Sequence, residues 1–361
     1  MPSLSAGGDP TLTAALSPPR AHGAPLSRGT LRAQPEDFVV EEDLGFTASG
    51  SGQHVLLKVR KRDANTQWVA RELARACGCR QHDVGYAGLK DRRAVAIQWF
   101  SVPKSAVTLD AWVSVAGEGF KVVEAHAHSR KLPRGALAGN RFHVRIRGVE
   151  ADDASIAARV DSIIRRGVPN YFGPQRFGRD GANLTHIPDD PRSLRPPERG
   201  FVLSAARSVV FNAVAAERVL DGTWETLEIG DIANLDGRGS IFPVEPAAPP
   251  DTGASGPDDL SVRCARLDVH PTGPLWGRGA PASGGRINTL ERDVAARFSR
   301  ECSLVEQAGM EQERRALRLA VRDMEWSRDA DVVSVSFRLG RGSFATTVLR
   351  EIVDAETGDE Q

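Results

Sequence analysis

An aspartate in a polar turn is the residue of this chain best suited to chemistry. Asp91 lies between two segments that alternate like strands, and its neighbours at 90, 92 and 93 are all basic. A carboxylate is ionised at neutral pH, and flanking cations favour that charged form. Asp91 could therefore act as a nucleophile without a helper base. It could also be an ordinary turn aspartate that bonds to its own backbone.

A basic stretch at 126–147 is the next candidate. It holds six Arg or Lys residues, three His residues and no acid. Clustered cations release counterions when they meet phosphates, so the stretch could contact RNA. It could equally be the solvated face of a strand. His126 and His128 share a strand face but lack a third ligand, so we expect no metal site.

Aromatic residues occur in polar or glycine-rich surroundings. They are Phe38, Phe142, Phe172, Phe177 and Phe344. Each alone is typical of a hydrophobic core. Asn140, however, lies on the same strand face as Phe142, at the start of that strand. An asparagine beside a phenylalanine at a sheet edge could hold a planar base, one residue stacking and the other reading an edge.

Length and composition limit the class of protein. The 361 residues suffice for about two domains, and 40% of them are hydrophobic, which allows a sizeable core. No apolar run approaches the roughly 18 residues that span a bilayer, and the N-terminus lacks a secretory signal. Four scattered cysteines exclude a disulfide scaffold. We expect a soluble cytoplasmic protein whose net charge of zero leaves nucleic-acid binding to local patches.

The elements that must position these residues are mainly strands. Alternation predicts strands over 37–42, 54–59, 94–102, 120–128 and 140–147. A helix begins near Thr66, because Val69, Leu73 and Cys77 share one helical face. Since the strands and helices do not alternate regularly, we expect an α+β fold with a mainly antiparallel sheet.

The character of the sequence changes near residue 168. A helix is expected over 204–220, a Pro- and Gly-rich loop over 242–259 and a last strand over 332–337. A strand so late in the chain indicates that the middle is an insertion and that the last strand completes the first sheet. We therefore expect a disordered tail over 1–26, a core over 27–167 and 320–361, and an inserted domain over 168–319.

Six short motifs occur in a fixed order. They are QPEDFVVEE at 34–42, GLKDRRAV at 88–95, GNRF at 139–142, NYFGPQRFG at 170–178, SAARS at 204–208 and GSFAT at 342–346. Together they resemble the TruD family of tRNA pseudouridine synthases, from about residue 31 to residue 353. Ala96 departs from the family pattern, in which Thr is expected, and this affects a local hydrogen bond.

The resemblance implies a pseudouridine-synthase core with a mixed, mainly antiparallel sheet and an inserted TRUD domain. It implies a substrate uridine at position 13, in the D-arm region of tRNA, and no cofactor. Asp91 matches the catalytic aspartate. Apart from the resemblance, Lys90 is one of only six lysines among 47 basic residues and adjoins Asp91, so we expect it to be a charge partner for that carboxylate. The positions that contact the substrate or pack at the target base are matched by Phe38, Asn140, Phe142 and Phe344.

Two other functions stay open at this point. A catalytically silent RNA-binding protein would use the same basic strand and the same aromatic residues. A nucleoside glycosylase would need a pair of carboxylates, which Asp91 could form with Asp37 or Glu36.

Overall fold

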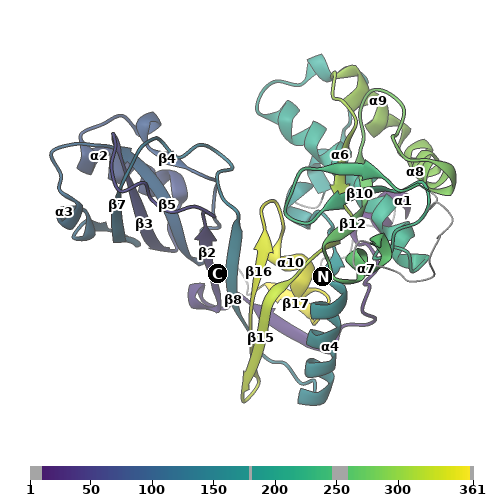
Figure 1. Cartoon of the computed structure of the whole chain (residues 1–361), viewed down its shortest axis with the longest axis horizontal. Coiled ribbons are helices and arrows are strands. Elements are labelled where there is room, and N and C mark those ends of the chain that lie inside the picture. Colours follow the sequence, from purple (N-terminus) through teal and green to yellow (C-terminus); the bar gives the residue numbers. More distant parts are fainter. Residues whose placement is uncertain (1–9, 179–180, 246–258, 358–361) are drawn as a thin grey trace. The chain divides into compact units, whose positions relative to one another are not determined.

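The computed structural model describes residues 10–178, 181–245 and 259–357. The chain divides into two compact units (Figure 1). We call Leu26–Ile156, Arg322–Ser343 and Val353–Gln361 the sheet unit. We call Met1–Pro25, Ala157–Val321 and Phe344–Ile352 the helix unit.

The sheet unit is built on a nine-stranded sheet. Its order is β15 (Arg322–Asp329), β16 (Val332–Gly340), β8 (Gly139–Ile146), β2 (Phe38–Asp43), β5 (Val95–Pro103), β3 (His54–Arg62), β7 (Phe120–His128) and β6 (Ala116–Gly117), and β4 (Gly85–Tyr86) pairs with β5. Strands β2 and β5 run parallel, and the other described pairs are antiparallel. The predicted α+β class with a mixed, mainly antiparallel sheet is confirmed.

The side chains of strand β8 alternate between a buried face and an exposed face of the sheet. Phe142, Val144 and Ile146 are buried, whereas the residues between them at 143 and 145 are exposed. This is the period-two pattern predicted from the sequence. Strand β16 pairs with β8 and places Phe337 opposite Phe142. The late strand therefore returns to the first sheet, as its position in the sequence predicts.

Helix α2 (Thr66–Cys77) packs on strands β3, β5 and β7. The side chain of Asn65 caps it by accepting a hydrogen bond from the main-chain nitrogen of Gln67, and Gly78 ends it with a φ of 71°. Its apolar face joins a buried cluster with residues of the three strands and with Trp112 of α3 (Leu109–Val113). The predicted helix start near Thr66 is confirmed.

A two-stranded parallel pair joins the beginning of the sheet unit to its end. Strand β1 (Arg28–Leu31) pairs with β17 (Asp354–Thr357), and Thr30 bridges to Arg147 just beyond β8. A short 3-10 turn, η1 (Pro35–Asp37), then leads into β2. Residue Arg32 therefore lies between two anchored elements.

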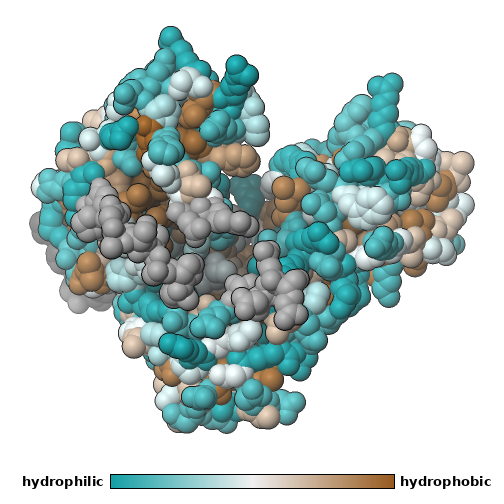
Figure 2. Space-filling model, turned by 180° about the vertical axis from the view of Figure 1, so that it is seen from behind, coloured by the Kyte–Doolittle hydropathy of each residue, from teal (hydrophilic) through white to brown (hydrophobic). Residues whose placement is uncertain are grey.

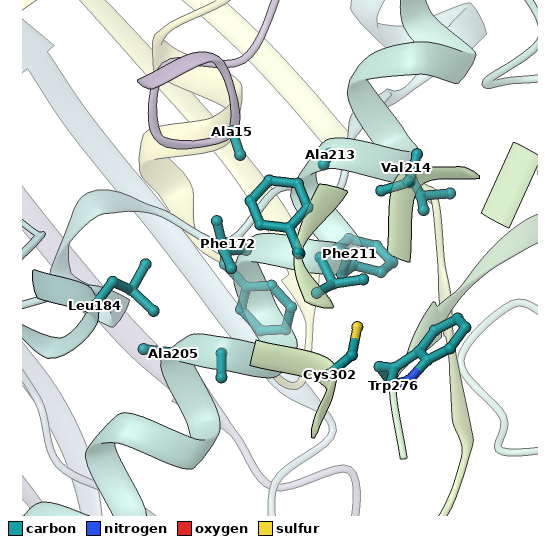
Figure 3. Packing of buried hydrophobic residues seen from close by; sticks show 14 of the residues in the cluster. Ala15, Phe172, Leu184, Ala205, Phe211, Ala213, Val214, Trp276 and Cys302 are labelled. Carbon is teal, nitrogen blue, oxygen red and sulfur yellow. The ribbon is translucent and has the colours of Figure 1, made fainter. Parts of the chain in front are cut away.

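The helix unit is centred on α6 (Glu198–Leu220). Its antiparallel sheet has the order β11 (Ile241–Pro243), β10 (Ile232–Leu235), β12 (Val269–Leu275) and β13 (Glu313–Ala316). The remaining elements are α4 (Asp153–Arg166), β9 (Val168–Pro169) paired with β14 (Arg318–Leu319), α5 (Ala182–Thr185), α7 (Leu260–Ala265), α8 (Gly285–Arg297), α9 (Ser299–Gln307) and α10 (Ala345–Leu349). Phe172 and Phe211 pack edge to face in the core, 5.5 Å between ring centroids (Figure 3).

Helix α6 is long and apolar enough to cross a membrane by length and composition, with a mean hydropathy of 1.2. No segment of this kind was expected from the sequence. The fold explains its composition, because 72% of the apolar window is buried inside the protein. Helix α6 is thus a buried core helix of the helix unit, and hydrophilic residues cover much of the face shown in Figure 2.

The N-terminal segment differs from the predicted disordered tail. Residues 1–9 lie outside the described part, but Pro10–Leu16 form helix α1, whose Ala15 is buried in the core of the helix unit (Figure 3). Asn212 donates to the Ala15 carbonyl, and the Glu351 carboxylate accepts hydrogen bonds from the main-chain nitrogens of Ala21 and His22. The prediction of disorder over 1–26 is therefore corrected for residues 10–25, because distant side chains satisfy their main chain.

The unit boundaries differ slightly from the expected domain boundaries. The helix unit includes residues 157–167 and 344–352, which were expected in the core. The second segment belongs to it because α10 and the ring of Phe344 pack against its elements. The loop expected over 242–259 lies largely outside the described residues. The expected core (27–167 and 320–361) and insertion (168–319) stay a proposal about domains.

Gly139 begins β8, next to the main chain of β16. A Cβ atom there would lie 2.2 Å from the Leu339 carbonyl oxygen, so we expect Gly139→Ala to destabilise the sheet unit by about 1–3 kcal/mol. The matched control is Gly340→Ala, because Gly340 pairs with Gly139 but a Cβ there meets nothing within 4 Å. Urea unfolding of both variants checks this; equal midpoints would contradict it.

Candidate active site

The loop 88–93 carries Asp91, and buried polar side chains hold its main chain. Gln98 of β5 donates from Nε2 to the Gly88 carbonyl at 2.7 Å. The hydroxyl of Thr66, at the start of α2, accepts from the main-chain nitrogen of Lys90 at 3.1 Å and donates to Gln98 at 3.0 Å. Gln98 and Thr66 are fully buried. The loop is thus fixed from below although its outer residues are exposed.

The carboxylate of Asp91 forms an ion pair with Arg32. Oδ2 lies 2.7 Å from Arg32 Nη2, and the Asp91 side chain is 60% exposed. The same guanidinium lies over the ring of Phe38, 4.3 Å from its centroid. Arg32 adopts a φ of 58°, which is uncommon for a residue with a side chain and typical of functional positions. The structure therefore offers an accessible, oriented carboxylate.

Lys90 makes different contacts from those expected of it. Its ammonium lies 3.0 Å from Glu42 Oε1 and 2.8 Å from Asn140 Oδ1. Glu42 and Asn140 are direct neighbours across β2 and β8, and the Glu42 side chain is fully buried. The prediction that Lys90 is the charge partner of Asp91 is corrected, because Arg32 occupies that place and Lys90 neutralises Glu42.

Phe38 and Phe142 lie side by side on the same face of the sheet. Their rings meet edge to face, 6.0 Å between centroids, and Phe142 also packs on Phe337 at 5.5 Å. Both are buried, with exposures of 4% and 6%. They form an apolar floor next to Arg32. Phe344, by contrast, belongs to the helix unit, where its ring lies 6.4 Å from that of Phe172.

Five of the six predicted site residues therefore form one connected group in the sheet unit. Asp91 reaches Phe38 through Arg32, and Phe38 contacts Phe142. Lys90, next to Asp91, contacts Asn140. The sixth, Phe344, stays a prediction from the family resemblance.

Two further carboxylates near this group are held by arginines of their own. Buried Asp37 accepts a bidentate pair of hydrogen bonds from Arg147, at 2.7 and 2.9 Å. Burial raises the pKa of Asp37, but the hydrogen bonds from Arg147 and from the main chain outweigh it and hold the pKa below its usual value. Glu36 pairs with Arg62. Each of these two carboxylates pairs with an arginine other than Arg32. These contacts therefore do not favour the pairing of Asp91 with a second carboxylate that a glycosylase would need.

Two of the three histidines of the basic stretch have local partners. His126 contacts Glu124 at 3.1 Å, and His128 accepts from the main-chain nitrogen of Ser49 at 3.2 Å. Within residues 10–178, 181–245 and 259–357, no group of three or more His, Cys, Asp and Glu side chains is placed to hold a metal ion.

Sequence reasoning missed Arg32, Glu42 and Lys61, which contact the candidate site residues or their main chain. Glu42 ends the first motif, and its buried position follows from strand alternation. Lys61 carries the signal that drew attention to Lys90, since Lys is rare in this Arg-rich chain. No local pattern points to Arg32.

Comparisons with known proteins agree on one family. The family described as "TruD: tRNA pseudouridine synthase D (TruD)" matches residues 21–187 and 192–352. A protein named tRNA pseudouridine synthase D from Nitrosococcus oceani is 43% identical over 357 residues, covering 97% of this chain and 93% of that protein. One of the same name from Methylococcus capsulatus is 42% identical over 341 residues, covering 93% and 94%.

A solved structure is similar in fold. The crystal structure of a protein assigned as a tRNA pseudouridine synthase D (TruD) from Methanosarcina mazei gives a TM-score of 0.72 and covers 96% of this chain and 98% of that chain. The two sequences are 20% identical, so this likeness concerns the fold alone.

The buried Glu42–Lys90 pair yields a stability prediction. Glu42→Ala leaves the Lys90 ammonium and the main-chain nitrogen of Trp99, which donates to Glu42, without this acceptor. We expect a loss of about 3–5 kcal/mol in the free energy of unfolding. The control is Glu41→Ala. Glu41 is partly exposed and pairs with Lys58 on the opposite face of the sheet, so its loss should lower the free energy of unfolding by at most about 1 kcal/mol. Urea unfolding measures both, and equal losses would refute the expectation.

Proposed function

Because this chain belongs to the TruD family of tRNA pseudouridine synthases, we propose that it is an isomerase that converts a uridine of tRNA into pseudouridine. The observation that carries this proposal is the exposed Asp91 carboxylate, paired with Arg32 next to the apolar floor of Phe38 and Phe142. All of these residues except Arg32 lie in segments that carry the family motifs.

The reaction needs one reactive carboxylate and no external group. The N1–C1′ bond of uridine breaks, the uracil turns, and a C5–C1′ bond forms. The C5 hydrogen leaves as a proton and N1 gains one, so atoms and charges balance without an oxidant or a cofactor. Asp91 would either attack C1′ and leave when C5 bonds, or take the C2′ proton and return it.

Arg32 would keep the carboxylate oriented. The planar guanidinium is itself held in place by stacking on Phe38. The ion pair is partly exposed, so an incoming nucleotide would cover it. Removal of water in that step strengthens the electrostatic interactions at the reacting carbon.

Asn140 and the aromatic floor would hold the detached uracil. Lys90 donates to the carbonyl oxygen of the Asn140 amide, which leaves the amide NH2 as the end that donates to a uracil carbonyl. Phe38 and Phe142 would pack below the ring, since a flipped base costs a few kcal/mol to unstack and stacking returns about 1–3 kcal/mol.

The remaining details of the proposal follow from the family resemblance. The target is the uridine at position 13, in the D-arm region of tRNA, and Phe344 contributes to substrate binding. The protein works in the cytoplasm with tRNA as its partner. His143 and Arg145, which are exposed on the face of β8 opposite to Phe142, would contact the phosphates of that RNA.

The decisive variant is Asp91→Asn, which keeps size and polarity but removes the charge. We expect it to fold and to bind tRNA, while pseudouridine formation falls about a thousandfold or more, as it does when a reacting group is removed. Release of tritium from C5-labelled uridine in tRNA measures the rate. The control is Asp63→Asn, a nearby partly exposed aspartate paired with Arg92, which should keep near wild-type release.

The same assay separates the alternatives. A silent RNA-binding protein would bind tRNA and release no tritium. A glycosylase would release free uracil, which chromatography detects, whereas a synthase keeps the base in the RNA. Wild-type release by Asp91→Asn would reject the assignment of Asp91.

A further inference from the structure

Lys61, near the end of β3, is a fully buried lysine directly beneath the loop of Asp91. Its ammonium donates to the carbonyl oxygens of Asp91 and Ala64, both at 2.8 Å, and lies 3.4 Å from that of Lys90. An ammonium has three donors, and these three hydrogen bonds use all of them on main-chain carbonyls. One of the three carbonyls belongs to the candidate catalytic residue itself.

The choice of residue type is informative. Burying a charge is costly unless hydrogen bonds compensate it, and this chain uses Arg for all but six of its 47 basic residues. A guanidinium is a planar fork suited to carboxylates, whereas an ammonium is a compact charge with three donors that suits converging carbonyls. Lys61 therefore fits a site that an arginine would not fill in the same way.

We propose that Lys61 is a positioning residue whose ammonium holds the main chain of Asp91 in the geometry needed for reaction. The proposal rests on the proposed function, since it assigns a role to a residue that does not touch the substrate. Gln98 and Thr66 fix the loop at Gly88 and at the Lys90 nitrogen. Lys61 adds a third hydrogen-bonded attachment, at the carbonyl oxygen of Asp91. The main chain of the loop is therefore held both before and at Asp91.

The charges around Lys61 make its role depend on pH. Burial lowers the pKa of Lys61 from 10.5 to about 8, and Lys90 also lowers it, whereas Asp91, Glu42 and Asp63 raise it. As pH rises through about 8, the amine loses a donor, and we expect the rate to fall. Folding stability moves the other way between about pH 8 and 10.5, because the unfolded chain there binds the proton that the folded chain has released.

The first test replaces Lys61 by Met, which keeps the length of the chain and removes the ammonium. We expect the single-turnover rate to fall about a hundredfold, the size of effect that a small misplacement of a reacting group causes, with tRNA affinity within about threefold. Lys58→Met is the control, because Lys58 lies on the same strand but pairs with Glu41 and Glu124 on the opposite face. A Lys61→Met rate within twofold of wild type overturns the proposal.

A charge-retaining variant supplies a readout that a purely structural role would not move. The wild-type rate should decline above about pH 8, whereas Lys61→Arg, whose charge persists, should show no decline there at whatever activity it keeps. Identical alkaline declines in both proteins overturn the proposal.

A third measurement needs no substitution at Lys61 and no catalysis. The six lysines can be labelled with ¹³C at Cε and titrated by NMR. We expect one midpoint near 8, which shifts lower in Asp91→Asn because that variant loses the attraction of the carboxylate. A Lys61 midpoint near 10.5, or one that Asp91→Asn leaves unchanged, overturns the proposal. Wild-type protein that makes no pseudouridine defeats the proposed function, whereas a fully active Lys61→Met defeats this inference alone.

Discussion

The candidate site depends on how the main chain of one exposed loop is fixed. Residues 88–93 lie outside the ladder of the large sheet, so sheet pairing does not hold them. Buried Gln98, Thr66 and Lys61 bind their carbonyl and amide groups instead. A carboxylate can then be accessible to a large substrate and still have a defined position, because the rigidity lies below the loop and not in the side chain that reacts.

This arrangement places several charged groups in the interior. Glu42 and Lys90 compensate each other, and Lys61 is compensated by carbonyl dipoles. Such groups are weak contributors to net stability, since desolvation offsets most of their attraction. Their benefit lies in geometry: each group has few other positions in which its hydrogen bonds are satisfied. The site therefore gives up some stability in exchange for a single loop conformation.

Much of the fold and part of the candidate site could be predicted from local sequence patterns. The alternation along β8, the cap at Asn65 and the loop around Asp91 all follow from short stretches of sequence. The partner of Asp91 did not, because Arg32 is 59 residues away and no periodicity connects the two. The order of residues 10–25 was also missed, since Asn212 and Glu351, which bind their main chain, are far along the sequence. Adjacency likewise favoured Lys90 over Arg32, although a neighbour in sequence can point to the opposite side of a turn.

The pairing of β1 with β17 has a consequence for folding during synthesis on the ribosome. Strand β1 emerges early, but its partner at 354–357 is translated only after all the strands of the large sheet. Strand β16, which covers Phe142, is also late. Contacts this distant in sequence form slowly, so the nascent sheet must wait with an open edge while the intervening unit is synthesised. Emergence of residues 354–357, and not of the motif around Asp91, therefore sets the earliest moment at which the sheet unit can be complete.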